Sequence, residues 1–89
     1  MSETRKNIIR VVKALSPEMK RLATFIGKHP ELAFKEFKAQ EKLITFLKTH
    51  GFKIQKGVGG IQTSFLATLT RGSGPKIGFL AEYDALPGI

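Results

Sequence analysis

Hydrophobic residues recur at three- and four-residue spacing through residues 3–28. This is the spacing of the buried side of an amphipathic helix. The residues concerned are Ile8, Ile9, Val12, Leu15, Met19, Leu22, Ala23 and Ile26. A helix-capping serine, a proline and a glutamate at residues 16–18 predict a kink or a restart of this helix. Pro30 ends it, because the residue before a proline is disfavoured in the α conformation.

A second amphipathic helix is predicted from about Glu36 to His50. Gly51 follows at the position where a left-handed C-terminal cap is favoured, and His50 is suited to interact with the last carbonyl groups of the helix. The apolar side of this helix is formed by Phe37, Leu43, Ile44, Phe46 and Leu47.

The hydrophobic period changes to two after Gly51, which predicts strands at residues 52–56, 64–71 and 76–83. The Gly-, Ser- and Pro-containing link between the last two favours an antiparallel pair. Glycines 57, 59 and 60 lie between strands and lack a phosphate-loop spacing, so they indicate a flexible turn. The predicted fold class is α+β (α/β in the intact enzyme discussed below), with two helices on one face of three strands. Predicted buried residues are Phe37, Leu47, Phe65, Leu66, Ile77 and Phe79.

Charge adds a possible partner to this picture. The 89 residues carry fifteen Lys and Arg against seven Asp and Glu, a formal net charge of +8, which raises nucleic acid or an acidic protein as a partner. The basic residues are spread singly, as on solvated helix faces. Exposed aromatic residues for base stacking are missing, so nucleic acid is disfavoured.

The composition excludes several other classes. There is no cysteine, so disulfides and thiolate metal sites are absent. No run approaches the roughly 20 apolar residues that span a bilayer, and no apolar signal core is present. These observations predict a soluble, cytoplasmic protein without a membrane partner.

Glu82 and Asp84 are the candidate functional residues. They stand two positions apart at the end of the third predicted strand, so their side chains share a side of an extended chain. The ends of apolar strands commonly carry the chemistry of enzymes that contain a sheet. The alternative is that the strand simply ends in polar residues.

Three stretches carry a family resemblance. They are "KHPELAFKEFKAQEKLITFLKTHGF", "GVGGIQTSFLATL" and "IGFLAEYDALPGI", and they resemble the N-terminal part of the aminoacylase, hippurate hydrolase and aminobenzoyl-glutamate hydrolase family of dinuclear-metal amidohydrolases. The segments at residues 29–32 and 82–87 are the most specific. The resemblance implies that residues 1–89 form one partial domain, the N-terminal piece of a zinc-peptidase-like catalytic domain.

The resemblance also implies roles for the two carboxylates. Asp84 occupies the position of the Asp that steers a metal ligand. Glu82 occupies the ligand position, where many members carry His, and is expected either to bind a metal weakly or to support another ligand. The intact enzyme is expected to use two divalent ions, zinc or manganese, on an N-acyl amino acid or dipeptide substrate. The 89 residues alone are expected to be inactive and to hold no metal, because a catalytic zinc needs about three protein ligands.

Two other interpretations stay open. The chain could be a small basic non-enzymatic domain that binds nucleic acid or an acidic partner. It could instead be an interaction module that recruits a partner by adding a strand to an exposed sheet edge. The third predicted strand, apolar on both faces, also makes self-association an expectation.

Overall fold

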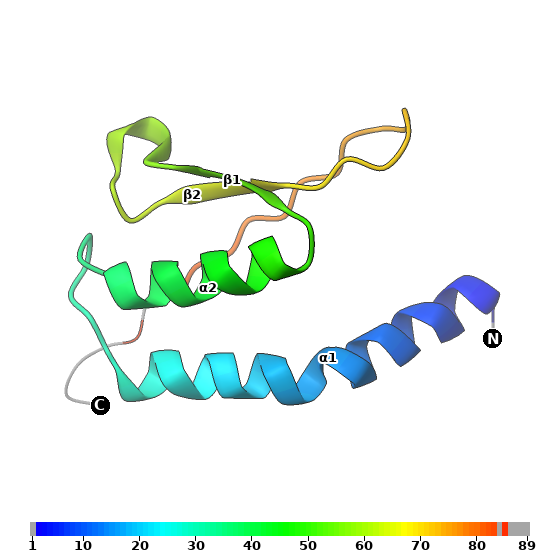
Figure 1. Cartoon of the computed structure of the whole chain (residues 1–89), viewed down its shortest axis with the longest axis horizontal. Coiled ribbons are helices and arrows are strands. Elements are labelled where there is room, and N and C mark those ends of the chain that lie inside the picture. The colour runs from blue at the N-terminus through cyan, green and yellow to red at the C-terminus, as the bar shows by residue number, and fades with distance from the viewer. Residues whose placement is uncertain (1, 84, 86–89) are drawn as a thin grey trace.

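The computed structural model describes residues 2–83 and 85. Its elements, in order, are helix α1 (Glu3–Lys28), helix α2 (Phe37–Thr49), strand β1 (Lys53–Lys56), a 3-10 turn η1 (Val58–Gly60) and strand β2 (Phe65–Thr68). Helix α2 lies between α1 and the β1–β2 hairpin (Figure 1). The α+β class is thus confirmed, but only α2, rather than both helices, lies against the sheet.

Helix α1 runs without interruption through the predicted restart. It begins where the Ser2 side chain accepts a hydrogen bond from the backbone N–H of Arg5 at 3.1 Å. Pro17 lies inside the helix, and Figure 1 shows the helix axis bending near its middle. A proline in a helix interior removes one backbone donor and favours such a bend. The predicted restart is therefore wrong, while the predicted kink corresponds to this bend.

Helix α2 ends as its sequence predicts. Residues 37–49 are helical, with Glu36 and His50 as the flanking cap residues. Gly51 has φ +90°, a conformation that costs a glycine little, and its N–H donates to the carbonyl of Lys48. The chain then reverses into β1 within two residues of Gly51, so the predicted boundary between helices and strands is confirmed.

The two strands form an antiparallel hairpin. Lys53 pairs with Thr68 and Lys56 with Phe65, so the sheet joins the first and second predicted strands rather than the second and third. The link between them contains η1, and its glycines 57, 59 and 60 all have positive φ. The predicted glycine-rich turn is the hairpin connection itself.

Residues 76–83, predicted as the third strand, carry no regular secondary structure. Ile77 is 78% exposed and Phe79 94% exposed, so the prediction that both are buried is wrong. A strand needs a neighbour for its backbone groups, and this segment makes no backbone hydrogen bonds to another part of the described chain. Apolar side chains alone do not supply that neighbour.

The buried residues lie between α2 and the hairpin. They are Ala39, Gln40, Ile44 and Thr63. Leu47 and Phe65 are half-buried, whereas Phe37 and Leu66, also predicted to be buried, are exposed. This core is small because the hairpin is only four residues long on each strand. Among the described residues, no helix is both long and apolar enough to cross a membrane.

Candidate functional site

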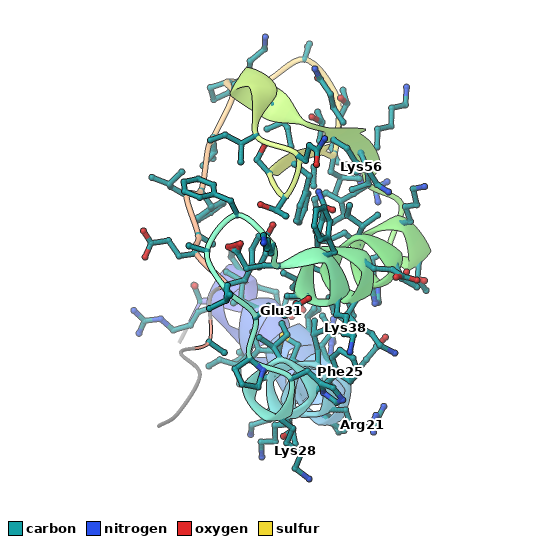
Figure 2. All side chains as sticks on the ribbon, turned by 90° about the vertical axis from the view of Figure 1, so that its left-hand side faces the viewer. Arg21, Phe25, Lys28, Glu31, Lys38 and Lys56 are labelled. Carbon is teal, nitrogen blue, oxygen red and sulfur yellow. The ribbon has the colours of Figure 1, made fainter. Side chains whose placement is uncertain are left out.

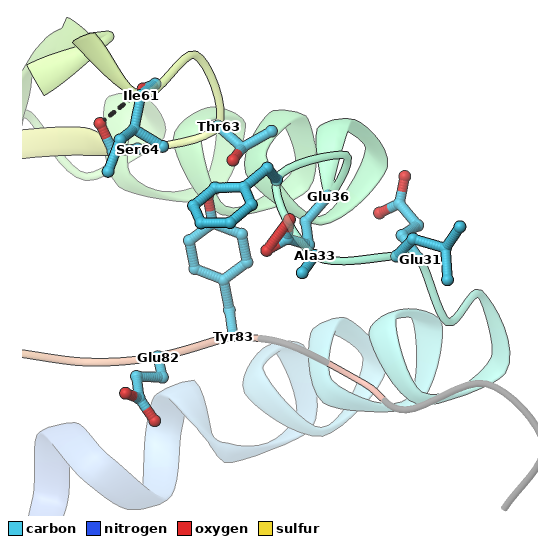
Figure 3. Close-up of a pocket in the computed structure, with 10 residues that line it drawn as sticks. Glu31, Ala33, Glu36, Ile61, Thr63, Ser64, Glu82 and Tyr83 are labelled. Carbon is cyan, nitrogen blue, oxygen red and sulfur yellow. Dashed lines mark hydrogen bonds between the residues drawn. The ribbon is translucent and has the colours of Figure 1, made fainter.

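An open pocket of about 580 Å³ lies where three parts of the chain meet. Its walls come from the α1–α2 connection, the loop before β2, and the C-terminal segment at Glu82 and Tyr83 (Figure 3). Two further carboxylates, those of Glu31 and Glu36, also line it. The pocket is thus acidic although the chain is basic overall.

The connection between the helices is built from two capping side chains. His29 Nδ1 lies 2.8 Å from the carbonyl oxygen of Phe25 at the end of α1, and the two rings stack with centroids 4.1 Å apart. Glu31 accepts hydrogen bonds from the backbone N–H groups of Lys38 and Ala39, each at 3.0 Å. The segment "HPE" therefore closes one helix and opens the next. Figure 2 shows Glu31 at this connection, above Lys38.

The hydrogen bonds at Glu31 set its ionisation. Partial desolvation opposes the charge on this carboxylate, but the N–H groups of Lys38 and Ala39 and the positive charge of Lys38 favour it, so the pKa of Glu31 is lowered. A carboxylate at a helix N-terminus also interacts favourably with the helix dipole. Glu31 is thus a charged structural anchor for the pocket wall.

Figure 3 shows the Tyr83 side chain pointing from the C-terminal segment toward the other walls of the pocket. Its ring centroid lies 6.1 Å from that of Phe65 on β2. Partial burial, together with the carboxylates of Glu36 and Glu31, raises the pKa of the Tyr83 phenol. Glu36 contributes a carboxylate oxygen, Oε1, that is buried without a hydrogen-bond partner among the described residues. The pocket therefore offers a protonated phenol as donor and a carboxylate as acceptor.

A buried amide holds the loop that forms the opposite wall. Gln40 Nε2 donates to the carbonyl oxygens of Gln62 at 2.9 Å and Ser64 at 3.0 Å. Ser64 Oγ in turn donates within the same loop, to Val58 at 2.8 Å or to Ile61 at 2.7 Å. Because both amide hydrogens of Gln40 are used inside the protein, the loop is fixed to α2.

The structure places one of the two predicted site residues. Glu82 lines the pocket but is exposed, and Figure 3 shows its carboxylate pointing away from the Tyr83 ring. The ordinary alternation of an extended chain separates neighbouring side chains in this way. Asp84 lies outside the described residues, so its predicted role stays a prediction.

The described residues do not fit a metal site. Residues 2–83 and 85 contain no cluster of three or more His, Asp or Glu side chains that could hold an ion. His29 and Glu31 are engaged at helix ends. His50 ends α2, with Nε2 3.6 Å from a carboxylate oxygen of Glu18. No ligand set for zinc or manganese is therefore assembled in this part of the chain.

Known proteins provide a test of the family resemblance that the three sequence stretches carry. No protein-family model matches the chain. Over all 89 residues it is 36% identical to a subunit of the p-aminobenzoyl-glutamate hydrolase of Escherichia coli (strain K12). The predicted resemblance to amidohydrolases is confirmed. The chain spans 18% of the length of this amidohydrolase relative.

Four residues shape the pocket although sequence reasoning assigned none of them a site role. They are Glu31, Glu36, Gln40 and Tyr83. Glu31 caps α2 from seven and eight residues away, outside the three-residue spacing of a capping box. The partners of Gln40 lie 22 and 24 residues further along the chain. Two of the four had a usable signal: Tyr83 lies between the two predicted site residues, and Glu31 lies in the segment 29–32 that carries part of the family resemblance.

Proposed function

We propose that a protein containing these 89 residues hydrolyses the amide bond of an N-acyl amino acid or of a small peptide-like molecule. The observation that carries this proposal is the 36% identity over the whole chain to the p-aminobenzoyl-glutamate hydrolase of E. coli. The name of that relative describes cleavage of an amide between an aromatic acyl group and an amino acid. The proposed substrates share the main feature of p-aminobenzoyl-glutamate, an amide bond between an acyl group and an amino acid.

The two carboxylates next to Tyr83 have separate roles in this proposal. Asp84 orients a metal ligand, and Glu82 stands at or beside the ligand position. The family resemblance supports two divalent ions, zinc or manganese, as cofactors. Since the described residues assemble no ligand set, the remaining ligands belong to parts of the enzyme beyond this chain.

For the 89 residues alone we propose no turnover. Two carboxylates without an imidazole or thiolate form an oxygen-only partial site, which selects zinc poorly. Calorimetric titration of the chain with zinc is expected to show weak binding or none. Tight, stoichiometric zinc binding by the chain would contradict this assignment.

A chimeric enzyme tests the proposed activity directly. The 89 residues replace the aligned segment of the E. coli relative, and release of p-aminobenzoate is measured under conditions in which the native E. coli enzyme is active. We expect hydrolysis, because the exchanged segment is 36% identical over its whole length to the segment that it replaces. A chimera that purifies with the native mass and thermal melt but releases no p-aminobenzoate would contradict the proposal.

Asp84→Asn in an active chimera tests the site assignment. It keeps the size of the side chain and removes its charge, and loss of such an orienting carboxylate typically costs about 10–100-fold in metal affinity or activity. Glu82→Gln is expected to cost less. The matched control is Gln55→Glu on β1, an exposed site, which should leave turnover unchanged. Equal turnover of Asp84→Asn and the control would remove Asp84 from the site.

A further inference from the structure

The connection between α1 and α2 contains a turn whose third residue has an unusual backbone conformation. The N–H of Lys35 donates to the carbonyl oxygen of Leu32 at 2.9 Å, so residues 32–35 form a hydrogen-bonded turn. Phe34, the third residue, has φ +63° and is the only non-glycine residue with positive φ in the part of the chain that the structure describes. Type II turns take glycine or asparagine at this position, because larger side chains crowd the backbone there. The turn is therefore strained at Phe34.

The contacts around the turn fix this conformation. Glu31, which precedes the turn, accepts hydrogen bonds from the N–H groups of Lys38 and Ala39, which follow it, each at 3.0 Å. The Phe34 ring itself is not part of the core, because the residue is 68% exposed. The strain is thus imposed by the surrounding backbone and is not offset by burial of the ring within the described chain. Strained residues of this kind concentrate at active and ligand-binding sites.

The strained residue lines the same pocket as Glu82, one of the two proposed site residues. Phe34 contributes to the apolar part of the pocket wall together with Leu32, Ile61 and Tyr83. The volume of about 580 Å³ is within the range of pockets that hold small molecules. An acyl group that is bound next to Glu82 is therefore brought close to the Phe34 ring.

We propose that Phe34 is a specificity-determining residue that contacts the acyl group of the substrate and favours aromatic acyl groups over small aliphatic ones. This inference rests on the proposed hydrolase function and names the acyl side of its substrate class. Aromatic rings pair in offset-stacked or edge-to-face geometry at centroid separations of about 4.5–7 Å, and Phe34 and Tyr83 offer two rings in one pocket. Because the turn holds the Phe34 backbone in advance, little conformational freedom is lost when the acyl group binds.

The strain at Phe34 can be measured in the 89 residues themselves. Phe34→Gly removes the side chain that crowds the backbone at positive φ, and should shift the unfolding equilibrium toward the folded state by about three- to tenfold. The matched control is Phe37→Gly at the first residue of α2, where glycine should favour unfolding. Urea unfolding followed by circular dichroism measures both. A Phe34→Gly chain no more stable than the wild type would overturn the proposal, because the turn would then hold no strain.

Substrate discrimination tests the role of the ring, in the chimeric enzyme described above. The measured quantity is kcat/KM for p-aminobenzoyl-glutamate and for N-acetyl-glutamate. Phe34→Ala should lower kcat/KM about tenfold more for the aromatic substrate than for the acetyl substrate. Phe34→Tyr keeps an aromatic ring and should preserve the wild-type ratio. Gln55→Glu, at an exposed site on β1, is the control and should leave both values unchanged.

The outcomes separate this inference from the proposed function. A wild-type chimera that hydrolyses neither compound would contradict the proposed function, and this inference with it. An active chimera in which Phe34→Ala leaves the ratio of the two kcat/KM values unchanged, or raises it toward the aromatic substrate, would overturn the role of Phe34 alone. Equal losses for both substrates would mean that the ring packs against another part of the enzyme.

Discussion

The α2–hairpin unit and the segment at residues 74–83 are built from similar apolar residues but reach opposite states. In the first, Ala39 and Ile44 are 3% and 4% exposed and the strands pair along four residues each. In the second, Leu80 is fully exposed. Hydrophobicity is alike in the two regions, so the difference lies in the backbone. A segment becomes part of the fold where its N–H and C=O groups are satisfied, within a helix as in α2 or by a neighbouring strand as in the hairpin.

The largest expected effect contrasts one buried and one exposed apolar side chain. Ile44→Ala should lower the free energy of unfolding by about 2–4 kcal/mol, because it removes buried methyl groups and leaves a cavity. Phe79→Ala should change it by less than about 0.5 kcal/mol, because the side chain is solvent-exposed. Urea unfolding followed by circular dichroism, at concentrations too low for association, measures both. Equal losses would show that the C-terminal segment packs as the core does.

The second-largest effect on stability is expected from the hydrogen bonds that attach the loop before β2 to Gln40 of α2. Gln40→Leu should destabilise the fold by about 1–3 kcal/mol, because the carbonyl groups of Gln62 and Ser64 lose their buried donor. Gln55→Leu, at an exposed position on β1, is the matched control and should be close to neutral. Hydrogen exchange of the amides between η1 and β2 should also accelerate in Gln40→Leu alone. An unchanged exchange pattern would show that the loop is held by other contacts.

The smallest expected effect concerns pH and Glu31. The pKa of Glu31 is lowered by folding, so its contribution to stability is present above the ordinary glutamate pKa of about 4.3. That contribution is lost as the pH falls through the lowered, folded-state value. The free energy of unfolding of the wild type should exceed that of Glu31→Gln by about 1 kcal/mol at neutral pH, as measured by urea unfolding. The gap should close in strong acid, whereas a gap that is independent of pH would mean that the charge of Glu31 does not matter.

Local sequence signals predicted the local parts of this fold. The bounds of α2 and the reversal at Gly51 follow from hydrophobic period and from a residue that tolerates positive φ. His50 ends α2 as predicted, but its ring lies beside Phe46 and near Glu18, and the helix carbonyls are capped by its backbone N–H rather than by its side chain. Such features depend on neighbours within one turn of helix, which a sequence displays directly.

The parts that could not be predicted depend on distant partners. The hydrogen bonds of Gln40 join α2 to a loop more than twenty residues away, and no local pattern encodes that distance. Residues 76–83 contain a short apolar run that is typical of a buried strand, but a strand forms only beside another. Of the predicted site, the structure places Glu82 at the rim of the pocket, and Asp84 lies outside the described residues.

The pocket contains the chain's only tyrosine, and the chain has no tryptophan. At wavelengths longer than the phenylalanine absorption band, Tyr83 is therefore the only side chain that absorbs light. The fluorescence excited at those wavelengths comes from Tyr83 alone. The ring lies against Phe65 near the carboxylates of Glu31 and Glu36, so its emission and its alkaline titration report the state of this single pocket. The molecule thus carries a built-in optical probe at the junction of its helices, its hairpin and its C-terminal segment.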